Sequence, residues 1–326
     1  MTLHGPDIAF VLSGGASLGA VQAGMLRALF ERGVRPDVIV GTSAGAMNGA
    51  FIASRPPAVA TAEELGEIWR GLRRGQVFPL NPLGGLLGFL GARDHLVGEC
   101  GLRRLIARHT EHELLEELPV PLHVVAVDVL TGEELLLSSG SLSDAIAASS
   151  AIPGVLPPVA WGERMLMDGG VANNTPISQA VALGARRVYV LPTGHACALS
   201  EPPRGALDMA LHAISLLTQR RLIEDIERHR GDAELVVLPP PCPLSVTPLD
   251  FSRADELIAR GLADAREFLD GGGEQQPPIR MRMHAHPRLA GEVTEDVRRP
   301  GVEERVLSGP DLLDEELVDA GVRERL

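Results

Sequence analysis

A serine at the centre of segment 41–45, which reads Gly-Thr-Ser-Ala-Gly, has the neighbours of a catalytic nucleophile. The apolar run 38–40 precedes it as a predicted strand, and a helical pattern follows. In the G-x-S-x-G turn between a strand and a helix, residues such as Gly41 and Gly45 let neighbouring backbone pass closely while the Ser43 hydroxyl projects outward. A serine helix cap beside glycines would have the same sequence, so these five residues alone leave both interpretations open.

A glycine-rich turn at the end of the first predicted strand could supply hydrogen-bond donors. The segment Leu12–Gly19 consists mainly of small residues, which leave backbone N–H groups unblocked. Acyl transfer needs such donors where negative charge develops on the substrate. A dinucleotide-binding turn is disfavoured, because the glycines do not fit G-x-G-x-x-G and the second strand ends in the serine turn instead of an acidic residue.

A third segment contributes a carboxylate. Asp168, Gly169 and Gly170 follow the predicted strand 164–167. The aspartate lies at the carboxyl end of the strand, and the two glycines allow another loop to approach closely. By itself this sequence is most often an ordinary turn, so its meaning depends on what lies beside it.

The elements that must position these residues alternate along the chain. Short aliphatic runs bounded by glycine and proline alternate with segments of helical period, which predicts an α/β fold with a mostly parallel sheet. The predicted strands are 8–12, 38–40, 122–127, 134–137, 164–167, 187–191 and 234–238. The main predicted helices are 17–31, a segment from the serine turn to about 56, 63–73, 143–149, 177–183, 207–228 and 254–269.

Composition excludes several function classes. The net charge of −13 and an aromatic content of 3% argue against nucleic-acid binding. Cys100, Cys197 and Cys242 are too widely spaced for a disulfide framework or a zinc knuckle, and the histidines form no ligand cluster, so no metal is expected. The sequence has no apparent secretory signal and no apolar run long enough to span a bilayer, which predicts a cytoplasmic protein.

Four sequence blocks together resemble the bacterial patatin-like phospholipases. They are 14–19, 41–45, 148–154 with Pro157 and Pro158, and 168–170, and the similarity extends over about Asp7–Leu269. The resemblance implies a three-layer α/β/α fold with a nucleophile elbow. It also implies a Ser-Asp dyad without histidine and hydrolysis of fatty-acyl esters in phospholipids, lysophospholipids or neutral lipids, without a cofactor.

Carried over by position, the resemblance makes Ser43 the nucleophile and Asp168 the general base. The oxyanion hole would consist of the amides of Gly14, Gly15 and Ala16. The residues that would support these motifs are Gly19, Gly41, Gly45, Gly169 and Gly170. A catalytic domain is expected over 1–270, followed by a Gly/Pro linker and a charged, flexible tail over 271–326.

Two residues depart from the family pattern. Ala16 and Leu18 stand where family members commonly have a third glycine and a basic residue. Alanine keeps its amide, but a positive φ would cost it about 1–2 kcal/mol. Without the basic residue, recognition of an anionic head group at this place is not expected. The reaction class is therefore predicted, whereas the head group, acyl length and oligomeric state are not.

Two other interpretations remain. A Ser-His-Asp hydrolase would need a late histidine, for which His195 is a better candidate than His229. A catalytically silent binding protein could keep the same fold. The segment 78–97 is rich in leucine and glycine, and it is either a satellite of the core or a cover over the acyl pocket. As a cover it would touch lipid, which implies transient contact with the inner face of the membrane.

Overall fold

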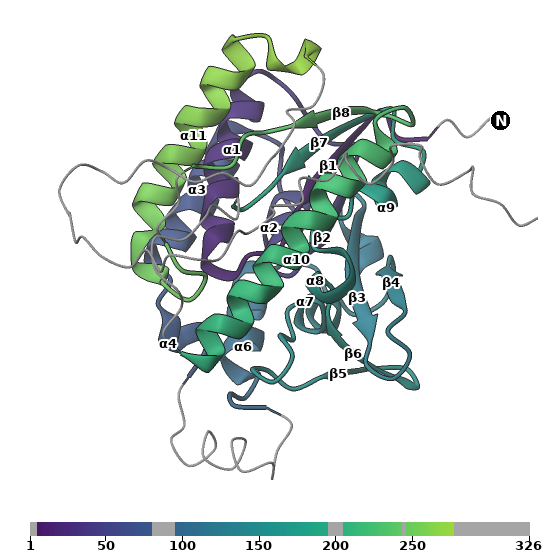
Figure 1. The fold of residues 1–326 in the computed structure, drawn as a ribbon, viewed down its shortest axis with the longest axis vertical. Coiled ribbons are helices and arrows are strands. Elements are labelled where there is room, and N and C mark those ends of the chain that lie inside the picture. Colours follow the sequence, from purple (N-terminus) through teal and green to yellow (C-terminus); the bar gives the residue numbers. More distant parts are fainter. Residues whose placement is uncertain (1–4, 80–94, 195–204, 243–245, 277–326) are drawn as a thin grey trace, which may run out of the picture. The chain divides into compact units, whose positions relative to one another are not determined.

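A twisted sheet forms the centre of the computed structural model, which describes residues 5–79, 95–194, 205–242 and 246–276. Among these residues, eight strands join in one sheet of order β5-β6-β3-β2-β1-β7-β8, with β4 paired to β3 (Figure 1). The strands are β1 (Ile8–Leu12), β2 (Val38–Thr42), β3 (Leu122–Asp128), β4 (Glu134–Leu137), β5 (Val159–Trp161), β6 (Arg164–Asp168), β7 (Arg187–Leu191) and β8 (Glu234–Val237).

The central strands of the sheet are parallel, and the antiparallel strands lie beyond β2, around β3. β1 pairs in parallel with β2 and β7, and the pairs β2–β3 and β7–β8 are also parallel. β4 and β6 run antiparallel to β3, and β5 runs antiparallel to β6. Leu12 of β1 lies opposite Gly41 of β2. The glycine-rich turn and the serine turn therefore leave the sheet side by side at its carboxyl edge.

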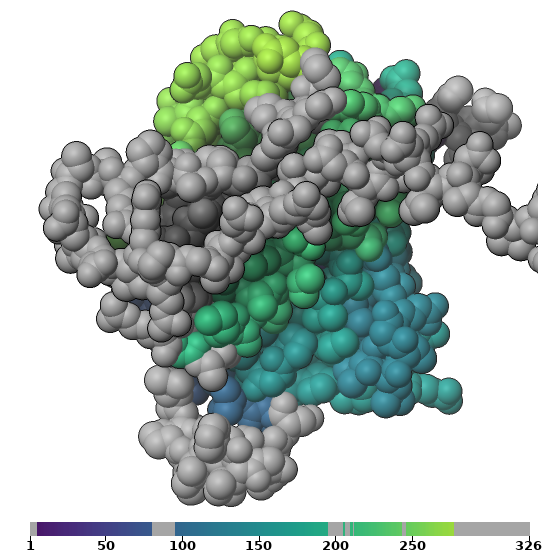
Figure 2. Space-filling view, in the orientation of Figure 1, coloured from purple at the N-terminus to yellow at the C-terminus, as the bar shows by residue number. Residues whose placement is uncertain are grey.

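Helices cover both faces of the sheet, which confirms the three-layer prediction. Phe10 and Leu12 of β1 point into a core shared with α1, α2, α3 and α11, whereas Ala9 and Val11 point to a core shared with α9 and α10. Figure 2 shows α10 as a green band across one face of the molecule. The helices are α1 (Ala20–Glu31), α2 (Ala44–Ala53), α3 (Val59–Gly71), α4 (Arg74–Val77), α6 (Cys100–His109), α7 (Leu142–Ser149), α8 (Gly170–Asn173), α9 (Ile177–Ala182), α10 (Ala206–His229) and α11 (Ala254–Asp270).

Each of the seven predicted strands is present, with bounds within two residues. β5, α4, α6 and α8 were not predicted, and α3 begins at Val59 instead of residue 63. The α6 sequence does carry a helical signal, because Leu102, Leu105 and Ile106 are spaced to bury one face and are all buried. No helix in the described part of the chain is both long and apolar enough to cross a bilayer.

The start of the predicted linker packs on the domain. After α11 the chain makes one 3-10 turn at Gly273–Gln275, in which Gly273 is buried. The hydroxyl of Tyr189 in β7 donates a hydrogen bond to the Glu274 carboxylate. The remainder of the predicted tail, 277–326, lies outside the described residues, as do His195 and most of the predicted cover, 80–94.

Candidate active site

Ser43 occupies a strained turn between β2 and α2. Its backbone has φ 53° and ψ −121°, which a non-glycine residue seldom adopts. A Cβ at Gly45 would lie 2.1 Å from the Leu12 carbonyl oxygen, and one at Gly41 would lie 2.8 Å from the backbone of Ala46. The two glycines are therefore required by close backbone contact, as the nucleophile-turn interpretation expects.

Asp168 lies within hydrogen-bond distance of Ser43. The Ser43 hydroxyl donates to Asp168 Oδ2 at 2.8 Å, and the amide of Gly170 donates to Asp168 Oδ1 at 2.7 Å. Ser43 and Asp168 are each only 7% exposed. β6 ends at Asp168, opposite Ala126 in β3, so the antiparallel β3–β6 pairing brings the aspartate to the serine. The structure thus brings together the two residues that the sequence nominates.

Burial makes Asp168 a stronger base than a carboxylate in water. Loss of hydration raises the pKa of Asp168 from 3.8 to about 6, while the Gly170 amide and the Ser43 hydroxyl partly oppose the rise. A carboxyl group with this pKa is still mainly ionised near pH 7 and accepts a proton more readily than an exposed aspartate.

The end of α7 holds both members of this pair. The Ser149 hydroxyl accepts a hydrogen bond from the Ser43 amide at 2.8 Å and donates one to the Val125 carbonyl. Two residues later, the Ala151 carbonyl accepts a hydrogen bond from the Asp168 amide at 3.0 Å. The block 148–154 therefore positions the serine and the aspartate, a role that its small residues do not reveal in the sequence.

The glycine-rich turn lies against Ser43, but its three predicted donors differ. A Cβ at Gly14 would lie 3.1 Å from Ser43 Cβ. The Gly14 amide already donates to the Asn174 carbonyl at 3.0 Å, so it is engaged elsewhere. The amides of Gly15 and Ala16 donate to no group within the described chain. These two remain as candidate donors to a substrate oxygen.

Ala16 adopts a positive φ, although it is not a glycine. Its φ is 49°, and it begins a 3-10 turn, Ala16–Gly19. A side chain in this left-handed region costs about 1–2 kcal/mol relative to the right-handed one. Leu18, which replaces the usual basic residue, packs partly buried against the main core. The turn is thus kept without glycine at its third position, and the position of the basic residue is apolar.

A buried polar network that the sequence analysis missed anchors the turn. The Gln22 amide group donates to the carbonyls of Ser13 and Leu191, both at 2.9 Å. Asn48 donates to Gln22 at 2.8 Å and accepts from the Trp69 indole at 3.0 Å. Buried amides satisfied in this way fix the relative positions of the elements that carry them. The available signal was a glutamine and an asparagine among small and apolar neighbours, Gln22 in α1 and Asn48 in α2.

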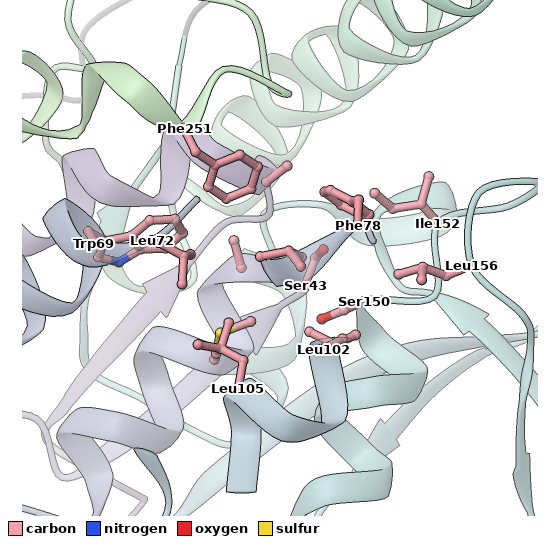
Figure 3. Close-up of a pocket in the computed structure, with 14 residues that line it drawn as sticks. Ser43, Trp69, Leu72, Phe78, Leu102, Leu105, Ser150, Ile152, Leu156 and Phe251 are labelled. Carbon is pink, nitrogen blue, oxygen red and sulfur yellow. The ribbon is translucent and has the colours of Figure 1, made fainter. Parts of the chain in front are cut away.

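An apolar cavity opens beside Ser43. Figure 3 shows Ser43 and Ser150 among the mainly aliphatic and aromatic side chains that line it. The lining comes from α2, α3, α6, the segment after α7 and the turn at Phe251; its apolar members include Met47, Trp69, Leu72, Phe78, Leu102, Leu105, Ile152, Leu156 and Phe251. Of the described residues that line it, none is charged. The lining of this cavity is therefore mainly apolar.

The remaining predicted residues have structural explanations. A Cβ at Gly169 would lie 2.3 Å from the Val125 carbonyl oxygen, and one at Gly19 would lie 2.8 Å from the Trp69 ring. His229 lies at the end of α10, where its ring pairs with Asp232 at 2.8 Å. The partner of the Ser43 hydroxyl is Asp168 and not this histidine. Among the described residues, no group of three or more histidines, cysteines or carboxylates is placed to hold a metal.

Comparison with known proteins gives one family. The model of the patatin-like phospholipase family matches residues 10–181, a range that contains Ser43 and Asp168. An uncharacterized NTE family protein of Mycobacterium tuberculosis is 30% identical over 203 residues, which are 59% of this chain and 32% of that protein. Patatin-like phospholipase domain-containing protein 6 of Homo sapiens is 31% identical over 194 residues, covering 59% of this chain and 14% of that protein.

The similarity covers only part of each relative. The match spans about a third of the mycobacterial protein and a smaller share of the human one. Among solved structures, VipD from Legionella pneumophila aligns with a TM-score of 0.43 and 14% identity, over 82% of this chain and 67% of that chain.

Proposed function

Because the chain belongs to the patatin-like phospholipase family, we propose that it hydrolyses fatty-acyl esters of lipids, with Ser43 as nucleophile and Asp168 as general base. The observation that carries this proposal is the 2.8 Å hydrogen bond from the Ser43 hydroxyl to a buried carboxylate beside an apolar cavity. A nucleophile within hydrogen-bond distance of its base is the geometry that nucleophilic catalysis requires.

In the proposed acylation step, Ser43 Oγ attacks the ester carbonyl carbon while its proton passes to Asp168 Oδ2. The carbonyl oxygen becomes an oxyanion, to which the amides of Gly15 and Ala16 would donate. When the tetrahedral intermediate collapses, the bond to the leaving alkoxy oxygen breaks. The proton on Asp168 passes to that oxygen, and the acyl group stays on Ser43.

Deacylation would use the same carboxylate. A water molecule attacks the acyl-serine carbonyl, and Asp168 takes its proton. Collapse of the second tetrahedral intermediate breaks the bond to Ser43 Oγ, which recovers a proton from Asp168 and releases the fatty acid. Since one group serves as base and then as acid in each half-reaction, no histidine is needed.

The proposed substrates are lipids with a long acyl chain, such as phospholipids, lysophospholipids or neutral esters. The apolar lining of the cavity supports an acyl chain, and Leu18 supplies no cation for an anionic head group. We further propose that catalysis resides in residues 1–270 and that the chain acts in the cytoplasm at the inner face of the membrane. The oligomeric state is not part of this proposal.

The test of this proposal compares fatty-acid release by the wild type and three variants on long-chain esters. Ser43→Ala serves as the blank. His195→Ala and His229→Ala should each stay within about twofold of the wild type, because a Ser-Asp dyad uses no histidine. A wild type no faster than the Ser43→Ala blank would favour the catalytically silent alternative. Loss of activity in either histidine variant, with an unchanged melting temperature, would favour a Ser-His-Asp site.

A further inference from the structure

Ser150 carries a buried hydroxyl with no hydrogen-bond partner among the residues that the structure describes. The residue is 7% exposed, and its Oγ contacts no donor or acceptor in that part of the chain. Among the buried side-chain atoms of the described residues, only Asn173 Oδ1 shares this condition. Buried polar groups are normally satisfied, because desolvation without a compensating hydrogen bond is unfavourable. An unsatisfied hydroxyl therefore needs an explanation, and a ligand that supplies the missing partner is one.

The position of Ser150 places a ligand of its hydroxyl beside the proposed dyad. The residue lies between Ser149, which holds the Ser43 amide, and Ala151, which holds the Asp168 amide. Its own side chain lines the cavity that contains Ser43 (Figure 3). The backbone that fixes the proposed dyad thus also fixes Ser150 at the cavity wall.

The polarity of the cavity lining indicates which chemical group could bind the Ser150 hydroxyl. Ser43 and Ser150 supply the hydroxyl groups of an otherwise apolar lining, and the Ser43 hydroxyl is already paired with Asp168. In a fatty-acyl ester, the acyl chain is apolar and the ester group is polar. When the ester group of such a lipid lies at Ser43, its oxygens can accept a hydrogen bond from the Ser150 hydroxyl. The described lining of the cavity offers that hydroxyl no other acceptor.

We propose that Ser150 is a substrate-binding residue whose hydroxyl donates a hydrogen bond to an ester oxygen of the bound lipid. This inference rests on the proposed function, because it takes an acyl ester as the occupant of the cavity. No described protein group satisfies this hydroxyl, and the ester oxygen of the substrate would supply the acceptor.

The adjacent serines provide a matched pair of variants. Ser150→Ala should lower kcat/KM on a long-chain ester about tenfold, which corresponds to about 1.4 kcal/mol for one hydrogen bond. Its melting temperature should stay the same or rise, because the substitution removes an unsatisfied buried group. Ser149→Ala should lower both activity and melting temperature, because the Ser43 amide and the Val125 carbonyl lose their partner.

Two results would overturn the inference. Ser150→Ala with activity within twofold of the wild type would mean that the hydroxyl does not meet the substrate. A fall in melting temperature like that of Ser149→Ala would mean that the hydroxyl supports the fold instead. The Ser43→Ala blank, measured alongside, separates the two proposals: if the wild type exceeds the blank while Ser150→Ala matches the wild type, only the Ser150 inference fails.

Discussion

Replacing Asp168 with asparagine is expected to lower kcat/KM for ester hydrolysis by a factor of about 10² to 10⁴, the usual contribution of a positioned general base. The amide has the shape of the carboxylate, and its oxygen can still accept from the Gly170 amide. It cannot take the Ser43 proton. Initial rates on a long-chain ester measure the effect, and activity near that of the wild type would exclude Asp168 as the base.

The same variant should be more stable than the wild type at neutral and alkaline pH, with a difference that develops as the pH rises from 3.8 to about 6. Burial raises this pKa from 3.8 to about 6, so the folded chain binds the proton more tightly than the unfolded chain. Stability from the protonated carboxyl is thus fully present below 3.8 and is lost as the pH rises through about 6. The corresponding cost of the ionised form at neutral pH is about 2 to 3 kcal/mol.

Asparagine resembles the protonated carboxyl at every pH. Thermal unfolding should therefore give a higher melting temperature for Asp168→Asn than for the wild type at about pH 8, and nearly equal values at about pH 4. A variant that loses activity together with stability at both pH values would indicate a misfolded site. Gain of stability with loss of activity identifies a group held in an unfavourable state for catalysis.

Gly15→Ala is the second substitution with a large expected effect. A Cβ at this position would lie 2.2 Å from Thr193 Oγ1 and 2.7 Å from Thr193 Cβ. Thr193 cannot easily withdraw, because it is buried and its hydroxyl donates to the Gly14 carbonyl at 2.6 Å. The turn must shift instead, which moves the amides proposed to bind the oxyanion. A displacement of about 1 Å can lower the rate about 100-fold.

A surface glycine gives the control for this substitution. A Cβ at Gly71, at the end of α3, would meet nothing within 4 Å, so Gly71→Ala should leave kcat/KM unchanged. The Gly15→Ala variant should still react stoichiometrically with an activated acyl donor, although slowly, since Ser43 and Asp168 are intact. If its kcat/KM stays within a few-fold of that of Gly71→Ala, the turn does not form the oxyanion hole.

The candidate site could be nominated from the sequence where local geometry restricts residue type. Gly45 admits no side chain beside the Leu12 carbonyl, and Gly169 admits none beside that of Val125, so both leave a visible motif around Ser43 and Asp168. The continuous apolar run of β1, Ile8–Leu12, likewise predicts a strand covered on both faces. Backbone requirements of this kind are written in neighbouring residues, and sequence reasoning can find them.

Properties that depend on distant partners could not be predicted. Ser149 and Ser150 are the same residue type side by side. The Ser149 hydroxyl bonds the Ser43 amide, whereas the Ser150 hydroxyl has no partner within the described ranges of the chain. The Gly14 amide is engaged by Asn174, which follows 160 positions later in the chain. The cavity lining comes from several separate segments, including α6. Only the folded arrangement determines these contacts.

The most direct test of the Ser43–Asp168 dyad is the rate at which a fluorophosphonate modifies the protein as a function of pH, with the modified residue identified by peptide mass. We expect modification at Ser43, with a rate that rises as Asp168 ionises through a pKa of about 6 and that is low and independent of pH in Asp168→Asn. Failure of the wild type to react at Ser43, or a wild-type rate that does not change between about pH 4 and pH 8, would contradict the account.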